Sequence, residues 1–282
     1  MHYAISIAVL SILSYPFLSH DFFNYLFDAK IFTYYHLNPY THRALDFPAD
    51  PWLRFMHWTH RTYPYGPSFL LISLLPSFAS FGKLILNFFF FKVLFAAGYL
   101  HTTYLLNKMN KSWTIFYGLN PLVIIEGLVN NHNDLIGVWL GIWAVYTIRN
   151  DKKAQAFILA VLCGGIKYLT LPLLAIFLPS KKYARILVAL GIIGLTTYLS
   201  IMRGFQPWYL LNLFLLVPLY PRLIIHLSPL FMGSLLTYYP YIALDGWGVS
   251  GNVAIKHTII MLSLVVQCIY MVGYFIYNRR KV

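Results

Sequence analysis

Long apolar runs alternate with short polar connections along the chain, and one polar stretch, residues 20–66, is much longer than the rest. A helix that spans a bilayer needs roughly 20 mainly apolar residues. Five runs approach that length and are expected to form a spanning scaffold: residues 3–19, 84–107, 182–201, 223–241 and 255–277. The first run has no basic n-region and no small-residue cleavage site, so we expect a retained membrane helix and not a signal peptide.

A second group of apolar runs is shorter, or is interrupted by helix-breaking or charged residues. It comprises residues 67–80, 113–129, 135–149, 154–178 and 208–221, with Asn120-Pro121, Gly164-Gly165 and Lys167 as interruptions. Segments of this kind often line a cavity in membrane proteins. The pattern therefore predicts an all-α polytopic membrane protein with about 8–10 transmembrane or half-membrane helices. We expect a single domain over residues 1–282, with residues 20–66 as a long extracytoplasmic loop after the first helix.

The composition supports a membrane environment and changes how the charge is interpreted. Hydrophobic residues make up 59% of the chain, charged residues 10%, and the mean hydropathy is +0.65, outside the range of a soluble globular domain. A net charge of +13 in a soluble protein would suggest nucleic acid, but here basic residues cluster in short connections and at the C-terminus: Lys108/Lys111, Arg149/Lys152/Lys153, Lys181/Lys182/Arg185 and Arg279/Arg280/Lys281. The positive-inside rule places these clusters on the cytoplasmic side. We expect an integral protein of the plasma membrane that binds no nucleic acid.

This sidedness puts the long loop and residues 130–134 on the extracytoplasmic side. Residues 154–178 then form a re-entrant hairpin with Lys167 near its tip, on the same side as the loop. Two apolar runs separate residue 66 from Lys108, where an odd number of crossings is required. Either residues 67–80 form a half-helix, or the sidedness differs there.

The long loop contains four of the eight acidic residues, led by Asp21. Asp21 follows the first apolar run directly, so its carboxylate is expected at the membrane interface. There it can accept a proton from a hydroxyl while a lipid-anchored partner stays in the membrane. The alternative is that Asp21 caps a short helix that runs to about His36.

The other three acidic residues of the loop have weaker claims to a chemical role. Asp28 lies seven residues after Asp21, on the same face of the expected helix, and is a candidate for substrate binding. Its alternatives are an ion pair with Lys30 or a position facing solvent. Asp46 and Asp50 lie on either side of Pro48 and are expected to form turns.

A second polar cluster lies inside the membrane pattern and consists of Glu126 with the segment 130–134. The candidate substrate contacts in this cluster are Glu126, Asn131, His132, Asn133 and Asp134. Such side chains can orient a carboxylate, hydrogen-bond a phosphate or bind a hard cation; alternatively, they only cap and turn between two helices. Glu126 lies in an apolar run and therefore needs a partner, for which Lys92 or Lys167 is the candidate.

Three basic residues on the expected outer face could balance the charge of a lipid phosphate: Arg61, Lys167 and Arg203. Arg61 and Arg203 could equally be interfacial residues whose charged ends reach toward water. Cys163 and Cys268 lie in apolar runs, so neither a disulfide nor a cysteine metal site is indicated. We assign no metal ligands, and among cofactors only a divalent cation is left open.

The motifs, taken in order, resemble the GT-C superfamily of multi-spanning glycosyltransferases, especially the polyprenyl-phosphate-mannose-dependent mannosyltransferases. The segments that carry the resemblance are HDFFNYLFDAKIFTYYHLNPY, YPYGP, LNPLVIIEGLVNNHNDLIGV, GGIKYLTLPLL and QPWYLLNLFLLVP, which are spread over residues 20 to 218. The chain departs from the family by being short, since many members carry more helices after this point.

The resemblance implies inverting transfer of a sugar, with mannose expected, from a polyprenyl-phosphate donor to a lipid or glycan acceptor. An aspartate of the first extracytoplasmic loop acts as the base in this family, and that role falls on Asp21. Substrate contacts are then also expected from Tyr63 and Tyr65 of YPYGP and from Gln206, Trp208 and Tyr209. A lipid or small-solute transporter or flippase is the alternative, because broken helices with charges at membrane depth are also typical of transporters.

Overall fold

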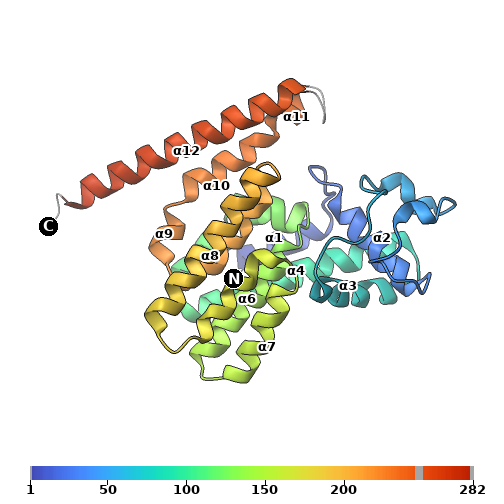
Figure 1. Cartoon of the computed structure of the whole chain (residues 1–282), viewed down its shortest axis with the longest axis horizontal. Helices are drawn as coiled ribbons and strands as arrows, with labels where there is room; N and C mark the ends of the chain where they lie inside the picture. The colour runs from blue at the N-terminus through green and yellow to red at the C-terminus, as the bar shows by residue number, and fades with distance from the viewer. Residues whose placement is uncertain (1, 245–249, 280–282) are drawn as a thin grey trace.

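The computed structural model describes residues 2–244 and 250–279, and the described part contains helices and no strand. The α-helices are α1 (His2–Ile12), α2 (Asp21–Thr33), α3 (Pro67–Ala79), α4 (Leu84–Met109), α5 (Lys111–Gly118), α6 (Asp134–Arg149), α7 (Lys153–Gly164), α8 (Lys181–Met202), α9 (Pro221–Ile225), α10 (Ser228–Leu235), α11 (Tyr239–Ala243) and α12 (Ser250–Arg279). The 3-10 helices are η1 (Ala44–Asp46), η2 (Pro51–Phe55), η4 (Tyr168–Phe177), η5 (Pro207–Leu216) and η6 (Leu236–Tyr238), and η3 (Val123–Val129) is a π-helix. The predicted all-α fold is confirmed (Figure 1).

Three helices, α4, α8 and α12, are long and apolar enough to cross a membrane. The predictions of long helices at 84–107, 182–201 and 255–277 are therefore confirmed. A fourth crossing is formed if α5 and η3 count as one span, because they are separated by a short break and bent by 66°. Pro121 lies in that break, where a proline cannot supply the backbone N–H that continuous helix requires. The protein is thus an integral membrane protein, as expected.

Two runs expected to span the membrane do not form single long helices. In the run 3–19, α1 ends at Ile12 after 11 residues, about 16 Å at the rise of an α-helix and short of a bilayer core. The run 223–241 is divided among α9, α10, η6 and α11. Pro229 and Pro240 each lie in the first turn of a new helix within that run. A proline disrupts the interior of a helix but is tolerated in the first turn, so each one marks a new start.

Two further segments of the expected topology form short elements. Helix α3 has 13 residues and packs against α2 and α4, which favours the half-helix interpretation of residues 67–80. Residues 154–178 form a hairpin of α7 and η4, with Lys167 directly before η4. Arg280 and Lys281 of the expected C-terminal basic cluster lie outside the described residues.

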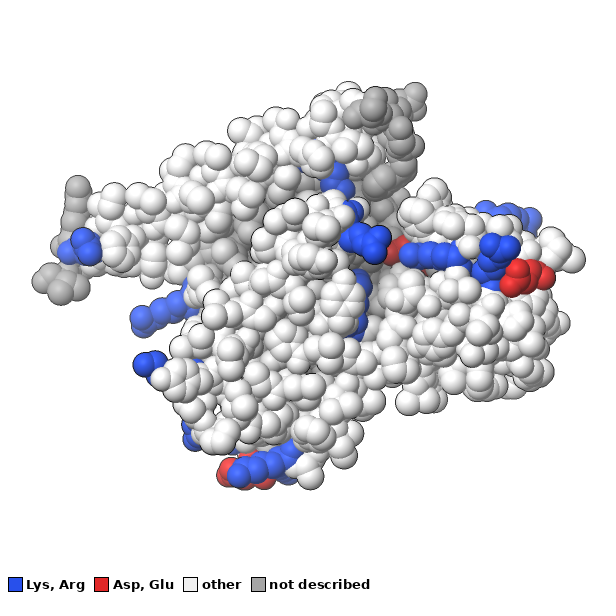
Figure 2. All heavy atoms as spheres, in the orientation of Figure 1, with Lys and Arg blue, Asp and Glu red and all other residues white. Residues whose placement is uncertain are grey.

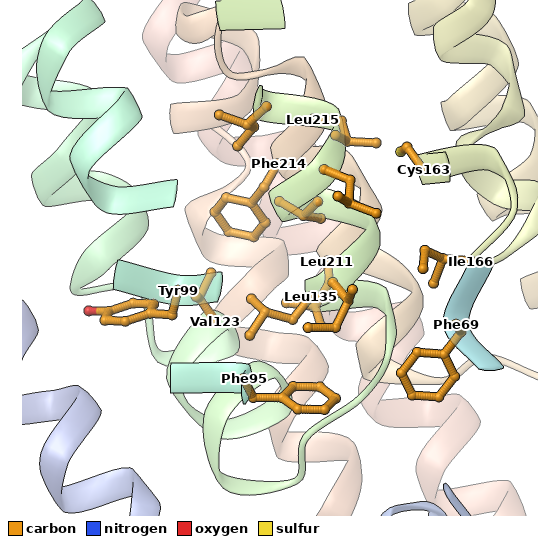
Figure 3. Close-up of a cluster of buried hydrophobic side chains, with 14 of the residues drawn as sticks. Phe69, Phe95, Tyr99, Val123, Leu135, Cys163, Ile166, Leu211, Phe214 and Leu215 are labelled. Atoms are coloured by element: carbon orange, nitrogen blue, oxygen red, sulfur yellow. The ribbon is translucent and has the colours of Figure 1, made fainter. Parts of the chain in front are cut away.

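The apolar core forms around α6, which packs against α4, α7 and η5. Figure 3 shows this cluster, in which Leu135 of α6 lies among Phe95 of α4 and Leu211 and Phe214 of η5. Gly141 permits the close approach of η5, because a Cβ at this position would lie 2.2 Å from a methyl carbon of Leu215. Tight packing around α6 fixes the position of its first residue, Asp134, at the site described below.

Helix α12 lies apart from this core and contacts it through α10, η6 and α11 (Figure 1). Within the 18-residue stretch of α12 that is apolar enough to span a membrane, only 11% is buried inside the protein. Figure 2 shows that most of the visible helix surface is uncharged, while Lys and Arg side chains gather at the edges and around a central depression. An apolar exterior is expected where helices face lipid.

Candidate active site

A cavity of about 950 Å³ lies where segments distant in the sequence meet. Its volume is at the upper end of the range typical of small-molecule sites. The wall is built from residues 17–21, the region of residues 57–67, the tip of the α7–η4 hairpin, the connection from α8 to η5, and two residues near the start of α12 and in α11. Its polar and aromatic lining includes Asp21, Arg61, Tyr65, Lys167, Arg203, Gln206, Trp208, Tyr209, Tyr241 and Lys256. Eight of these residues were predicted as site residues.

Backbone hydrogen bonds join the YPYGP segment to the tip of the hairpin. The N–H of Gly66 donates to the carbonyl of Ile166 at 3.1 Å, and the N–H of Ser68 donates to the carbonyl of Gly165 at 3.0 Å. Gly66 then begins α3 as its N-cap residue. This junction brings Arg61 and Lys167, which are more than a hundred residues apart, to the same cavity.

Asp21 is the first residue of α2, and its carboxylate lines the cavity. The N-cap residue is His20, with no side-chain capping bond, so the structure does not bear out the alternative of Asp21 as a cap. One carboxylate oxygen, Oδ1, lies 3.7 Å from Nη2 of Arg61, and the other, Oδ2, lies 4.0 Å from Nδ1 of His132. The side chain is 17% exposed, so it is held between two nitrogen-bearing groups and still reaches the cavity.

His132 is fully buried behind Asp21 and has close contacts on two sides. Its ring stacks on Trp208, with the centroids 4.1 Å apart and the planes 15° apart. Its Nε2 lies 3.2 Å from Oε2 of Glu126, which also accepts a hydrogen bond from Nδ2 of Asn130 at 3.1 Å. Asp21, His132 and Glu126 therefore form a row that runs from the cavity into the protein interior.

Neither of the two lysines expected as the partner of Glu126, Lys92 and Lys167, pairs with it. Lys92 donates instead to the carbonyl oxygens of Leu128 and Val129, at 3.3 and 2.8 Å, and so satisfies carbonyl groups at the end of η3. Lys167 pairs with Asp134, from Nζ to Oδ2 at 2.7 Å. Both lysines thus hold the polar segment 130–134 in place, one from each end.

Asp134 also accepts a hydrogen bond from Nδ2 of Asn212 at 2.7 Å, so both of its oxygens are engaged. Lys167 remains on the cavity wall, with Nζ 5.8 Å from the ring centre of Tyr209. Its ammonium therefore contacts the buried Asp134 carboxylate while the side chain still lines the cavity.

The structure places five of the predicted substrate contacts behind the wall of the cavity. Glu126, Asn131, His132, Asn133 and Asp134 are each at most 1% exposed and do not line it. Asn131 adopts a left-handed backbone, with φ of 56°, and neither its amide nitrogen nor its amide oxygen has a hydrogen-bond partner among the described residues. Asparagine tolerates that conformation better than most residues. The segment therefore supports the wall instead of forming its surface.

Asp28 and Tyr63 are also buried away from the cavity, at 4% exposure each. Asp28 neither pairs with Lys30 nor faces solvent, since Lys30 forms a buried ion pair with Asp50. Burial raises the pKa of Asp28 to about 8, although the nearby Arg61 opposes the shift. Asp50 does form the expected local turn, since its carboxylate caps η2 by accepting from the N–H of Trp52.

A family model described as alpha-(1->6)-mannopyranosyltransferase, N-terminal domain, matches residues 8–180 of the chain. The chain belongs to this family. It is accordingly a glycosyltransferase of mannosyltransferase type, which confirms that part of the function expected from the motifs. Comparison with curated proteins and with solved structures found no match.

The family match covers the mannosyltransferase cavity only in part. Asp21, Arg61, the 130–134 segment and Lys167 lie inside the matched residues, while the wall formed after residue 180 lies outside them. That outer part holds Lys256, which sequence reasoning missed because it stands alone in an otherwise apolar run. The signal that could have identified it is a lysine within an apolar run long enough to span a membrane.

Within residues 2–244 and 250–279, no group of three or more His, Cys, Asp or Glu side chains is placed to hold a metal ion. The four cationic side chains on the cavity wall, Arg61, Lys167, Arg203 and Lys256, suit an anionic substrate group instead.

Proposed function

We propose that this mannosyltransferase moves a mannosyl group from a polyprenyl-phosphate donor to a hydroxyl of a lipid or glycan acceptor, with inversion and with Asp21 as general base. The observation that carries the proposal is that Asp21 is the sole carboxylate among the described residues that line a cavity containing four cations. A base is needed for the acceptor, and positive charge is needed for the departing phosphate. The cavity contains both a carboxylate that can act as the base and cations that can balance the phosphate.

The chemistry follows from these two requirements. Asp21 takes the proton from the acceptor hydroxyl as its oxygen attacks the anomeric carbon of mannose. The bond from that carbon to the phosphate oxygen breaks, and the polyprenyl phosphate leaves with an added negative charge. A single displacement of this kind inverts the anomeric centre. General-base help is typically worth about 10² to 10⁴ in rate, and a preorganised donor to developing charge about 10² to 10³.

The contacts of Asp21 suit it to act as this base. Arg61 and His132 lie at opposite oxygens of the carboxylate, at 3.7 and 4.0 Å, and restrict its rotation. His132 in turn is held by Trp208 and Glu126, so we assign it as a positioning residue that acts through Asp21. Precise placement of the reacting group is a large part of catalysis.

The GT-C type and an extracytoplasmic active site at the plasma membrane are part of the proposal. Two helices support this orientation by the balance of their basic residues. In α7, Gly164 lies on the cavity at one end and Lys153 lies at the other, and in α8 the cavity end carries Arg203 while the other end carries Lys181, Lys182 and Arg185. Helix α8 has 22 residues, about 33 Å, which matches the thickness of a bilayer core. The positive-inside rule then favours a cavity that opens on the outer side.

The deciding experiment is mannosyl transfer by the purified full chain, supplied with radiolabelled polyprenyl-phosphate mannose and a membrane lipid extract. We expect a labelled product from wild type and a loss of about 10² or more in rate for Asp21→Asn. Asp151→Asn is the matched control, because this exposed aspartate lies in the α6–α7 turn, away from the cavity. Assays with and without a chelator test the divalent cation. Wild-type rates in Asp21→Asn would refute the role of the base, and flux of substrate without a covalent product would favour a transporter.

A further inference from the structure

The four cations of the cavity fall into two pairs that differ in their surroundings. Arg61 lies beside the carboxylate of Asp21, and Lys167 forms an ion pair with Asp134. Arg203 and Lys256 form no ion pair with any carboxylate in the described part of the chain. The first pair is therefore partly neutralised, while the second has no carboxylate beside it in the described part of the chain.

Lys256 occupies a position at which a lysine without an anionic partner is costly. Its side chain belongs to the apolar helix α12, and the residue is 7% exposed. The ammonium donates to Oε1 of Gln206 at 3.0 Å and lies 5.7 Å from the ring centre of Tyr241. One amide oxygen and one aromatic face do not satisfy the three donors of an ammonium. Charged side chains buried within apolar helices of membrane proteins normally face an anion, a partner or a functional cavity.

Arg203 lines the same cavity and lies at the end of α8. It is the C-cap residue of that helix, and the next residue, Gly204, adopts a φ of 78°, a conformation that glycine accepts without strain. The chain thereby turns into η5, whose N-cap is Gln206. Arg203 and Lys256 are thus both linked to Gln206 on the cavity wall: Arg203 precedes it by three residues in the chain, and Lys256 donates a hydrogen bond to its side chain.

We propose that Lys256 and Arg203 form the subsite for the phosphate of the lipid-linked donor, while Arg61 and Lys167 serve Asp21 and the wall. The assignment rests on the proposed function. During transfer the phosphate changes from a diester to a monoester and gains a negative charge. Two cations free of carboxylates are suited to stabilise that gain, because a donor aimed at developing charge acts more strongly in the transition state than before it. Gln206 holds Lys256 toward the cavity.

The test measures binding of polyprenyl phosphate and of the uncharged polyprenol to the purified full chain in nanodiscs. Wild type is expected to prefer the phosphate by about tenfold or more, the usual weight of a hydrogen bond to a charged group. Lys256→Met keeps an unbranched apolar stem and should lose most of this preference while binding polyprenol normally. Lys108→Met is the matched control, because Lys108 also lies over a tyrosine ring, that of Tyr104, but outside the cavity.

Two results would overturn the subsite: unchanged preference for phosphate in Lys256→Met, or equal displacement of polyprenyl phosphate by phosphatidylglycerol, which would indicate a general site for lipid headgroups. If Lys256→Met does not fold, Arg203→Gln at an exposed position supplies the same measurement, with a severalfold loss expected. Asp21→Asn should bind polyprenyl phosphate like wild type. Binding without any transfer by wild type therefore counts against the proposed function alone, and normal preference in the Lys256 and Arg203 variants counts against the subsite alone.

Discussion

Gly66 and Gly165 lie in direct backbone contact: a Cβ added to Gly66 would lie 2.0 Å from the carbonyl oxygen of Gly165. No side chain fits in such a gap, because real Cβ contacts are far longer. The contact joins the end of the long loop to the tip of the α7–η4 hairpin, and it places Arg61 and Lys167 on one cavity. The geometry of the candidate active site thus depends on two residues that carry no functional group.

Gly66→Ala is expected to separate these two segments, because the clash is with backbone that cannot rotate away. Overpacking of this kind typically costs about 1–3 kcal/mol, and transfer activity should fall with it. Gly194→Ala in α8 is the matched control, since a Cβ there meets no atom within 4 Å; alanine in a helix is also more favourable than glycine. Melting temperature and transfer rate are to be measured for both. Equal behaviour of the two variants would contradict the role of the contact.

The sequence predicted the elements of the site better than it predicted their partners. Asp21 could be identified because an acidic residue directly after an apolar run must lie near the membrane interface. The three long helices and the hairpin could be identified from runs of apolar residues alone. These features depend on local composition, which is visible in one stretch of chain.

Partners depend on packing between distant segments and were not visible in the same way. Glu126 pairs with His132, six residues along, because η3 is a π-helix and the chain turns at Asn131, whereas the sequence suggested a lysine from another helix. Lys256 was treated as part of a spanning run, since nothing near it in sequence indicates Gln206 as its acceptor. The prediction of one long helix over residues 223–241 was wrong because hydrophobicity does not show where a proline ends one helix and starts the next.

A second prediction concerns the row formed by Asp21, His132 and Glu126. His132→Phe keeps an aromatic ring against Trp208 but removes both nitrogens, so Asp21 loses one of its two neighbours. We expect kcat to fall by as much as about 10² with little change in KM for the donor, because the base is misplaced while the cavity is intact. His101→Phe is the control, since His101 also packs against tryptophan rings but lies outside the cavity. An effect on KM alone would argue against a positioning role.

A third prediction concerns the buried carboxyl of Asp28. Its pKa in the folded protein is about 8, raised from 3.8 by burial, so between these values the folded protein holds a proton that the unfolded chain has lost. Stability from this group is complete below the lower value and declines as pH rises toward 8, by at most about 1.4 kcal/mol per pH unit. Asp28→Asn carries no such proton. As pH rises from about 5 to 8, the melting temperature of Asp28→Asn should rise relative to that of wild type. A difference in melting temperature that does not change with pH would contradict a neutral Asp28.

The last prediction separates two ion pairs of the long loop that differ in burial. Lys30 and Asp50 form a buried pair, with side chains 7% and 1% exposed, whereas Arg43 and Asp46 are 52% and 38% exposed. Asp50 also accepts from the hydroxyl of Tyr35 at 2.6 Å. Removing one member of a buried pair leaves an uncompensated charge, so Asp50→Ala should cost about 3–5 kcal/mol. Asp46→Ala, the matched control, should change stability little, because exposed pairs contribute little.

The penalty in Asp50→Ala is expected to come from the stranded ammonium of Lys30 and not from lost packing. Adding Lys30→Met to Asp50→Ala should therefore recover most of the stability, since removal of both charges is often neutral where removal of one is not. Unfolding of the purified protein measures the cycle, and proteolysis of the loop reports whether the loss is local. If the double variant is less stable than Asp50→Ala alone, the contact of Lys30 with the Trp52 ring, 3.9 Å away, is what holds the loop.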